Sequence, residues 1–145
     1  MKNELIEVYR HDGAGYNPYL ITSLWQVAQL NHSQENAFYG IRRMDVHHHT
    51  DESFVLLKGT VVLIAASIAG EEVEFAPELM QYGRTYNIPE NCWHNLMMSE
   101  DAEVLIVENA NTHEADFEFH YLSDEQIDTL NGMVRTLLEQ EENAR

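Results

Sequence analysis

The sequence predicts an all-β fold, an antiparallel sandwich or barrel, followed by one C-terminal helix. Two observations carry this prediction. From about residue 20 to residue 122, short segments rich in β-branched and aromatic residues alternate with turn residues. From Ser123 onward, the apolar residues change to helical spacing. A chain of 145 residues has the usual size of one domain, so we expect a single domain over residues 1–145.

Turn residues separate the predicted strands along the chain. In order, these segments are SLWQVAQL (23–30), AFYGIRRMDV (37–46), SFVLLK (53–58), TVVLIAASI (60–68), RTYNI (84–88), AEVLIVEN (102–109) and FEFHYL (117–122), with a further strand beginning at His94. Gly59 and Gly70 mark tight connections. The continuous apolar run VVLIAA (61–66) indicates a strand that is covered on both faces.

The segment SDEQIDTLNGMVRTLLEQ predicts a helix over about residues 123–140. It places Ile127, Leu130, Val134, Leu137 and Leu138 on one face, which would pack on the outside of the β core. Ser123 is a suitable N-cap, and Gln126 three residues later completes a capping box. Gly132 costs about 1 kcal/mol relative to alanine within a helix, so a break there remains an alternative.

Composition excludes several classes of partner. The formal net charge of −17 repels nucleic acids and anionic membranes. The longest apolar run is far too short to cross a bilayer, and the N-terminal sequence MKNELIEVYR has charged residues where a signal peptide needs an apolar segment. A single cysteine, Cys92, excludes an intrachain disulfide bond. We expect a cytoplasmic protein that binds neither nucleic acid nor membrane.

Two groups of histidines stand out among the eight in the chain. His47, His48 and His49 are consecutive and precede an apolar run. His94 follows the turn sequence PEN, in which Pro89 fixes its own φ and Asn91 can adopt the left-handed conformation. We interpret the remaining histidines (His11, His32, His113 and His120) as surface or hydrogen-bonded residues.

These positions resemble the two sequence motifs of the cupin family. Gly83, Pro89 and His94 match the second motif at its spacing, with Asn91 in place of its middle glycine and Met98 in place of its final asparagine. Glu52 and Gly59 match the end of the first motif. The resemblance implies a double-stranded β-helix, or jelly-roll barrel, that holds a metal inside. It also implies a homodimer, for which SLWQVAQL would supply a pairing edge unless the chain's own N-terminus covers it.

The first motif can be read in two registers. His47 and His49 share one strand face with each other, whereas His48 shares parity with Glu52. A bulge at Thr50–Asp51 would bring His47, His49 and Glu52 inward together, and we favour this arrangement. In the other register, His48 points inward and the site keeps two histidines.

The favoured register gives a four-ligand metal site made of His47, His49, Glu52 and His94. Three imidazoles and one carboxylate suit a divalent transition metal (manganese, iron, nickel, cobalt or zinc) and leave positions open for a ligand. Alternation back along the strand aims Tyr39 and Arg43 inward, and Arg43 would suit an anionic ligand group. Glu108 ends a strand and is a third candidate for contact with a substrate.

Three functions are consistent with these features. The first is a metal-dependent enzyme that acts on a small polar molecule, such as a carboxylate or a sugar-like compound. The resemblance implies dioxygenase, isomerase, epimerase or lyase chemistry for it. The second is a non-catalytic protein that binds or senses such a ligand, and the third is a metal-free structural homodimer. No residue of the sequence marks itself as a separate general acid or base, so the reaction is left open.

Overall fold

A computed structural model describes residues 5–145 of the chain, which contain ten strands. The strands are β1 (Gly15–Ile21), β2 (Trp25–Asn31), β3 (Arg43–Val46), β4 (Glu52–Lys58), β5 (Val61–Ala69), β6 (Glu72–Leu79), β7 (Thr85–Ile88), β8 (Trp93–Met98), β9 (Glu103–Asn109) and β10 (Glu118–Tyr121). The helices are a 3-10 turn, η1 (Gln34–Asn36), a short α1 (Thr112–Ala115) and a long α2 (Asp124–Asn143).

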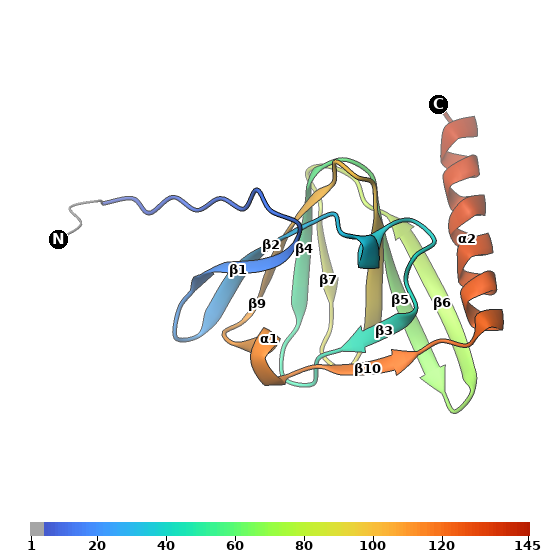
Figure 1. The fold of residues 1–145 in the computed structure, drawn as a ribbon, viewed down its shortest axis with the longest axis horizontal. Coiled ribbons are helices and arrows are strands. Elements are labelled where there is room, and N and C mark those ends of the chain that lie inside the picture. Colours follow the sequence, from blue (N-terminus) through green and yellow to red (C-terminus); the bar gives the residue numbers. More distant parts are fainter. Residues whose placement is uncertain (1–4) are drawn as a thin grey trace.

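The strands form two five-stranded sheets that face each other (Figure 1). The first sheet has the order β1-β2-β9-β4-β7, and the second has the order β10-β3-β8-β5-β6. The strands are antiparallel to their neighbours within each sheet, and most sheet neighbours are distant in sequence. This crossing connectivity makes a jelly-roll barrel, as the sequence predicted.

The space between the two sheets is filled by apolar side chains from both. Phe54 and Ile106 come from the first sheet, and Leu63 and Leu96 come from the second. Each is nearly inaccessible to solvent, and burying a side chain of this size stabilises the fold by about 1.5–3 kcal/mol. This core fills one part of the barrel and leaves the rest free for the polar site.

Helix α2 covers the outer face of the second sheet and stands beside β6 in Figure 1. Its residues Ile127, Leu130 and Val134 pack against Val62 and Ile64 of β5. Strand β5 is therefore covered on both faces, as VVLIAA predicted. The capping box of Ser123 and Gln126 is also confirmed, and the helix continues through Gly132 without a break.

The N-terminal part departs from the sequence predictions in two respects. Strand β1 was not predicted, and its pairing with β2 means that β2 lies between β1 and β9 rather than at a sheet edge. The expectation that SLWQVAQL pairs with a partner chain is therefore wrong, because the chain's own N-terminal strand occupies that edge. The predicted strand 37–46 is also shortened to Arg43–Val46, since a turn precedes it. The homodimer itself remains a prediction.

Neither α-helix within residues 5–145 combines the length and the apolar composition that a membrane span needs.

Candidate metal centre

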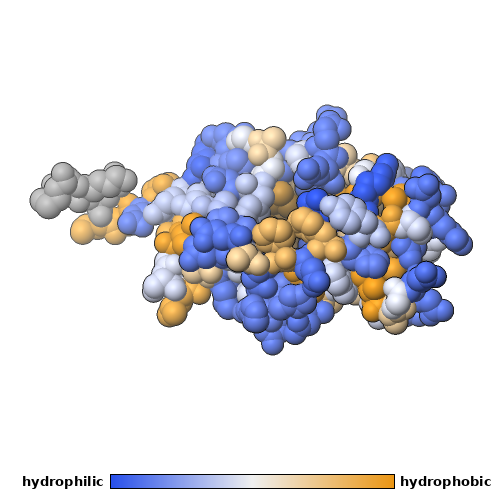
Figure 2. Space-filling view, turned by 60° about the horizontal axis from the view of Figure 1, so that its bottom comes forward, coloured by the Kyte–Doolittle hydropathy of each residue, from blue (hydrophilic) through white to orange (hydrophobic). Residues whose placement is uncertain are grey.

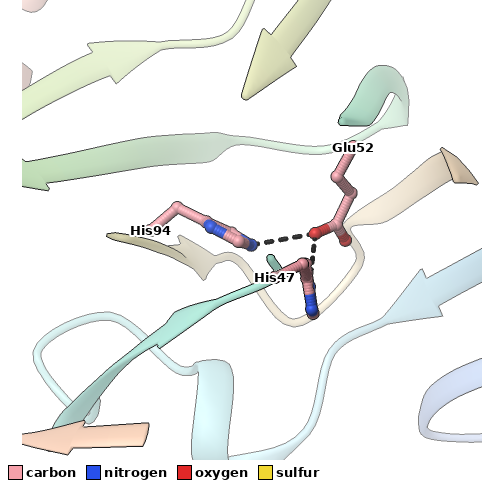
Figure 3. Close-up of side chains that lie close together, drawn as sticks. All are labelled: His47, Glu52 and His94. Carbon is pink, nitrogen blue, oxygen red and sulfur yellow. Dashed lines mark hydrogen bonds and ion pairs between the residues drawn. The ribbon is translucent and has the colours of Figure 1, made fainter. Parts of the chain in front are cut away.

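His47, Glu52 and His94 meet inside the barrel (Figure 3). Nε2 of His47 lies 2.8 Å from Oε2 of Glu52, and Nε2 of His94 lies 2.9 Å from the same oxygen. Glu52 begins β4 in the first sheet, His94 lies in β8 of the second, and His47 directly follows β3. The cluster thus gathers two imidazoles and one carboxylate from three separate segments of the chain.

The orientation of both imidazoles is fixed from behind. Nδ1 of His47 lies 2.6 Å from the carbonyl oxygen of Asp116, and Nδ1 of His94 lies 2.9 Å from the carbonyl oxygen of Cys92. Because a carbonyl oxygen only accepts, each Nδ1 carries the hydrogen and donates it. In a neutral imidazole this leaves the lone pair on Nε2, the atom directed at Glu52. Metal-binding histidines are held in the same way by an acceptor behind the ring.

The turn before His94 ties the two histidine segments together. Asn91 adopts φ 66°, the left-handed conformation that the sequence predicted for it. Its backbone N–H donates a hydrogen bond of 2.7 Å to the carbonyl oxygen of His47. The PEN turn therefore positions His94 and at the same time fixes the backbone of His47.

Charge stabilises the cluster against a strong cost of burial. Burial favours the neutral acid of Glu52, but hydrogen bonds from His47 and His94 outweigh it and lower its pKa. Burial also favours neutral His47, but the hydrogen bond and the charge of Glu52 raise its pKa to about 9. Burial also favours neutral His94, but the hydrogen bond and the charge of Glu52 raise its pKa. The buried carboxylate thus favours positive charge beside it, as a proton or as a metal ion.

A cavity of about 530 Å³ opens from this cluster, a volume suited to a small molecule. Arg43, Asp45 and Glu108 line it together with the cluster. Burial raises the pKa of Asp45 and of Glu108. With Glu35 and Arg42, which also line it, the cavity presents three further carboxyl groups and two guanidinium groups to a ligand.

A hydrogen-bonded group supports Glu108 at one side of this cavity. The hydroxyl of Tyr16 donates to Oε1 of Glu108, and Nε2 of Gln26 lies 3.0 Å from the same oxygen. Gln26 Nε2 also lies 3.2 Å from Nδ1 of His113. No sequence pattern indicated Tyr16 or Gln26, and we interpreted His113 only as a surface or hydrogen-bonded residue. Positions as far apart as 16 and 108 offered no local pattern that would have connected them.

The structure does not bring His49 to the cluster, although the sequence predicted it as a fourth ligand. His49 is exposed, and within residues 5–145 only its backbone forms hydrogen bonds, with its N–H 3.0 Å from Oδ2 of Asp116. Strand β3 ends at Val46, so the alternation that would align His49 with His47 does not apply. His48 is also exposed and contacts Asn91 and Glu118 outside the cluster.

Two of the predicted substrate residues line the cavity and one does not. Arg43 and Glu108 lie in its wall. Tyr39 instead has φ 65°, in a turn before β3, and belongs to the apolar cluster under helix α2. The guanidinium of Arg135 in that helix lies 4.9 Å from the Tyr39 ring centre. We expected the strand to extend back to Tyr39, but β3 begins only at Arg43. Strand alternation therefore does not direct Tyr39 into the cavity.

Known structures share the architecture of the chain at low sequence identity. A variant of Pac13 from Streptomyces, solved with uridine, is 12% identical over 86% of this chain and 97% of its own, with a TM-score of 0.53. A protein from Bacillus halodurans is 14% identical over 75% and 79% of the two chains, with a TM-score of 0.52. A cupin-2 domain protein from Shewanella frigidimarina is 20% identical over 68% and 84%, with a TM-score of 0.46.

The fold is a cupin-type jelly-roll barrel. The fold that the two sequence motifs implied is therefore confirmed. No protein-family model matches the chain, and no curated protein matches it in sequence. At these identities, the likeness extends to the fold alone.

The donor atoms of the cluster fit a metal ion. The three ligand atoms lie within 4.8 Å of one another. Two ligands at right angles, each about 2.1 Å from one ion, would be about 3.0 Å apart. The observed separations of 2.8 and 2.9 Å are close to this value. Two imidazoles with one carboxylate, and the other positions open, are typical of mononuclear iron(II) sites.

Proposed function

We propose that this protein binds one divalent transition-metal ion through His47, Glu52 and His94, and uses it to bind and act on a small polar molecule. The observation that carries the proposal is the convergence of both Nε2 atoms on Glu52 Oε2 at 2.8 and 2.9 Å. Both rings donate from Nδ1 to carbonyl oxygens, so in their neutral form the Nε2 lone pairs are directed at the centre. Two neutral imidazoles in this orientation need a cation between them and the carboxylate.

The proposed set differs from the sequence prediction by the loss of His49. Three protein ligands leave more positions open than four, which favours a metal that binds substrate over one with a purely structural role. Iron(II) and manganese(II) suit the mixture of imidazole and carboxylate donors. When bound, such an ion supplies Lewis acidity, which polarises an oxygen atom of the molecule that it holds.

The residues around the centre supply binding and proton positions for that molecule. Arg43 presents guanidinium N–H donors at the cavity wall. Glu108, held by Tyr16 and Gln26, presents a carboxyl group from the first sheet, whereas Arg43 belongs to the second. The similarly folded Pac13 is described as a nucleoside dehydratase, which supports a small polar molecule as the occupant of a barrel of this kind.

Metal analysis of the untagged protein tests the proposal. We expect about one equivalent of a first-row transition metal per chain, measured by mass spectrometry after exhaustive dialysis. Glu52→Gln keeps the shape of the side chain and removes its charge, so we expect this variant to lose the metal. Glu90→Gln, at an exposed carboxyl in the turn before His94, is the matched control and should keep it.

A protein that stays free of metal after incubation with iron(II), manganese(II) and zinc(II) in turn would overturn the proposal. Equal metal content in Glu52→Gln and in the unaltered protein would also overturn it. Circular dichroism of the variant would show that the barrel is intact in either case.

A further inference from the structure

Strand β10 carries a row of exposed aromatic side chains at the cavity. Its register with β3 sets Phe119 opposite Asp45 and Tyr121 opposite Arg43, so these rings share the cavity face of the second sheet. Phe117, just before the strand, also lines the cavity. We call Phe117, Phe119 and Tyr121 the aromatic rim.

The three side chains of the rim are exposed to solvent. Phe117 is 43% exposed, Phe119 is 37% exposed and Tyr121 is 67% exposed. Strand β10 lies at the bottom of Figure 1, the side that Figure 2 turns forward, and a hydrophobic patch surrounded by hydrophilic atoms lies in the middle of that view. Exposed apolar patches bordered by polar residues mark binding sites.

Arg43 lies on the rim with its donors free. Its guanidinium carbon lies 3.8 Å from the centre of the Phe119 ring, a cation–π contact that holds the group over the ring. Its Nε is 3.6 Å from Oδ1 of Asp45, an ion pair that is too long to be a hydrogen bond. Within residues 5–145, no hydrogen bond from this guanidinium is found. An oriented guanidinium with unused N–H groups is suited to two-point binding of an anion.

Two arginines lie at this cavity, although the chain as a whole is strongly acidic. The chain has 8 lysines and arginines against 25 acidic residues, yet Arg42 and Arg43 both line this cavity. Glu35, Asp45, Glu52 and Glu108 line it too, so an anion of low charge is favoured over a doubly charged phosphate. A carboxylate matches this balance and the geometry of the guanidinium.

We propose that the ligand of this cavity is a small aromatic carboxylate, with its carboxylate on Arg43 and its ring against the aromatic rim. The inference rests on the proposed function, because the metal centre would receive a second polar substituent of the ring. Phe117 connects the rim to the metal centre, because it directly follows Asp116, whose carbonyl oxygen accepts a hydrogen bond from His47. Its ring centre lies 5.3 Å from that of Phe119, so the two present one continuous apolar surface.

The size of the ligand follows from the sheet. In the second sheet, Phe119 is opposite Asp45, and Asp45 is opposite His94. Neighbouring strands are about 4.8 Å apart, so the backbones of Phe119 and His94 are separated by about 10 Å. A single ring with two polar substituents fits within this distance, and the cavity of about 530 Å³ accommodates it.

Calorimetric titration of the full-length protein with three probes tests the inference. 3-Hydroxybenzoate has the ring, the carboxylate and a second polar group, whereas phenol lacks the carboxylate and cyclohexanecarboxylate lacks the aromatic ring. We expect 3-hydroxybenzoate to bind at least about tenfold more tightly than either of the others. Arg43→Gln should weaken 3-hydroxybenzoate by about tenfold and leave phenol unchanged. Phe117→Leu should weaken both aromatic probes and leave cyclohexanecarboxylate unchanged.

Arg84→Gln is the control, because Arg84 is exposed in the connection between β6 and β7 and lies outside the cavity wall. Its binding of all probes should match that of the unaltered protein. Equal affinity for the three probes, or no binding of 3-hydroxybenzoate while the metal is retained, overturns this inference and leaves the metal proposal standing. Failure of the unaltered protein to take up metal overturns the proposed function instead. A lower molecular mass of Phe117→Leu in light scattering would assign the rim to contacts between copies and also overturn the inference.

Discussion

Nδ1 of His47 donates a hydrogen bond of 2.6 Å to the carbonyl oxygen of Asp116, although the two residues are 69 positions apart in the sequence. The carboxylate of Asp116 also accepts from the backbone N–H groups of His48 at 2.8 Å and His49 at 3.0 Å. One residue therefore orients the His47 ring and fixes the bend that follows it. The orientation of the His47 ring therefore depends on the segment around Asp116, which it contacts only in the folded protein.

Replacement of Asp116 tests this positioning role. Asp116→Ala removes the carboxylate that fixes the bend, so we expect metal affinity to fall by about 10–100-fold without loss of the fold. The measurement is competition for the metal with a chelator of known affinity. Glu114→Ala, at an exposed position of α1 nearby, should leave the affinity unchanged. Equal affinities of the two variants would show that the bend holds His47 without Asp116.

His94 and His49 should respond differently to replacement. His94 is buried at the cluster, whereas His49 is exposed outside it. We expect His94→Ala to abolish metal uptake and His49→Ala to keep about one equivalent, as measured by mass spectrometry. His48→Ala should behave like His49→Ala, because its ring contacts Asn91 and Glu118 instead. Loss of metal in His49→Ala would restore the four-ligand site that the sequence predicted.

The stability of metal-free protein should depend on pH. Glu52 raises the pKa of His47 to about 9 against the opposing effect of burial, compared with an ordinary value of 6.5. The resulting stabilisation is complete below about pH 6.5, and it is lost as the pH rises through about 9. We expect the Tm of chelator-treated protein to fall over this range. His47→Gln should show a smaller fall, and a Tm independent of pH in the unaltered protein would contradict the expectation.

Metal affinity should change with pH in the opposite sense. A metal binds the deprotonated imidazole, so each proton held by His47 or His94 must be released before binding. We expect the affinity measured by chelator competition to increase from pH 6.5 to pH 9. An affinity that stays constant over this range would mean that the histidines are neutral in the metal-free protein.

Two glycines with left-handed backbones allow a matched test of packing. Gly59 has φ +82° and Gly70 has φ +65°. A Cβ at Gly59 would lie 2.6 Å from Cα of Ala102, whereas nothing lies within 4 Å of one at Gly70. Gly70→Ala should lower the free energy of unfolding by about 1–2 kcal/mol, the cost of a left-handed alanine. Gly59→Ala should lower it by more than about 3 kcal/mol, because backbone must also move. Urea denaturation measures both values, and equal losses would contradict this account.

The strand order could not be written from the sequence, but most strands and the helix could. Turn chemistry is local, so the left-handed Asn91 and the capping box of Ser123 and Gln126 were predictable from neighbouring residues. The covered strand β5 was predictable because its apolar run is continuous. Strand β1 escaped prediction, since its burial is only partial and it includes Pro18 and Gly15.

Only the site residues that belong to the two sequence motifs were predicted correctly. His47, Glu52 and His94 were named from spacing, and the structure places them together. His49 and Tyr39 were named by extending strand alternation beyond the true ends of β3, which are set by contacts with distant residues such as Asp116. The support of Glu108 by Tyr16 and Gln26 joins residues from three strands, and no spacing along the chain encodes it.

Glu52 and His94 belong to sheets that are hydrogen-bonded separately. An ion bound to both would fasten the two walls of the barrel at one point, and the walls could not part there until it left. Loss of the ion and breathing of the barrel would then be a single event with a single rate. Amide hydrogens of β4 and β8 should therefore exchange with solvent on the timescale on which the ion dissociates, and much faster once it has been removed.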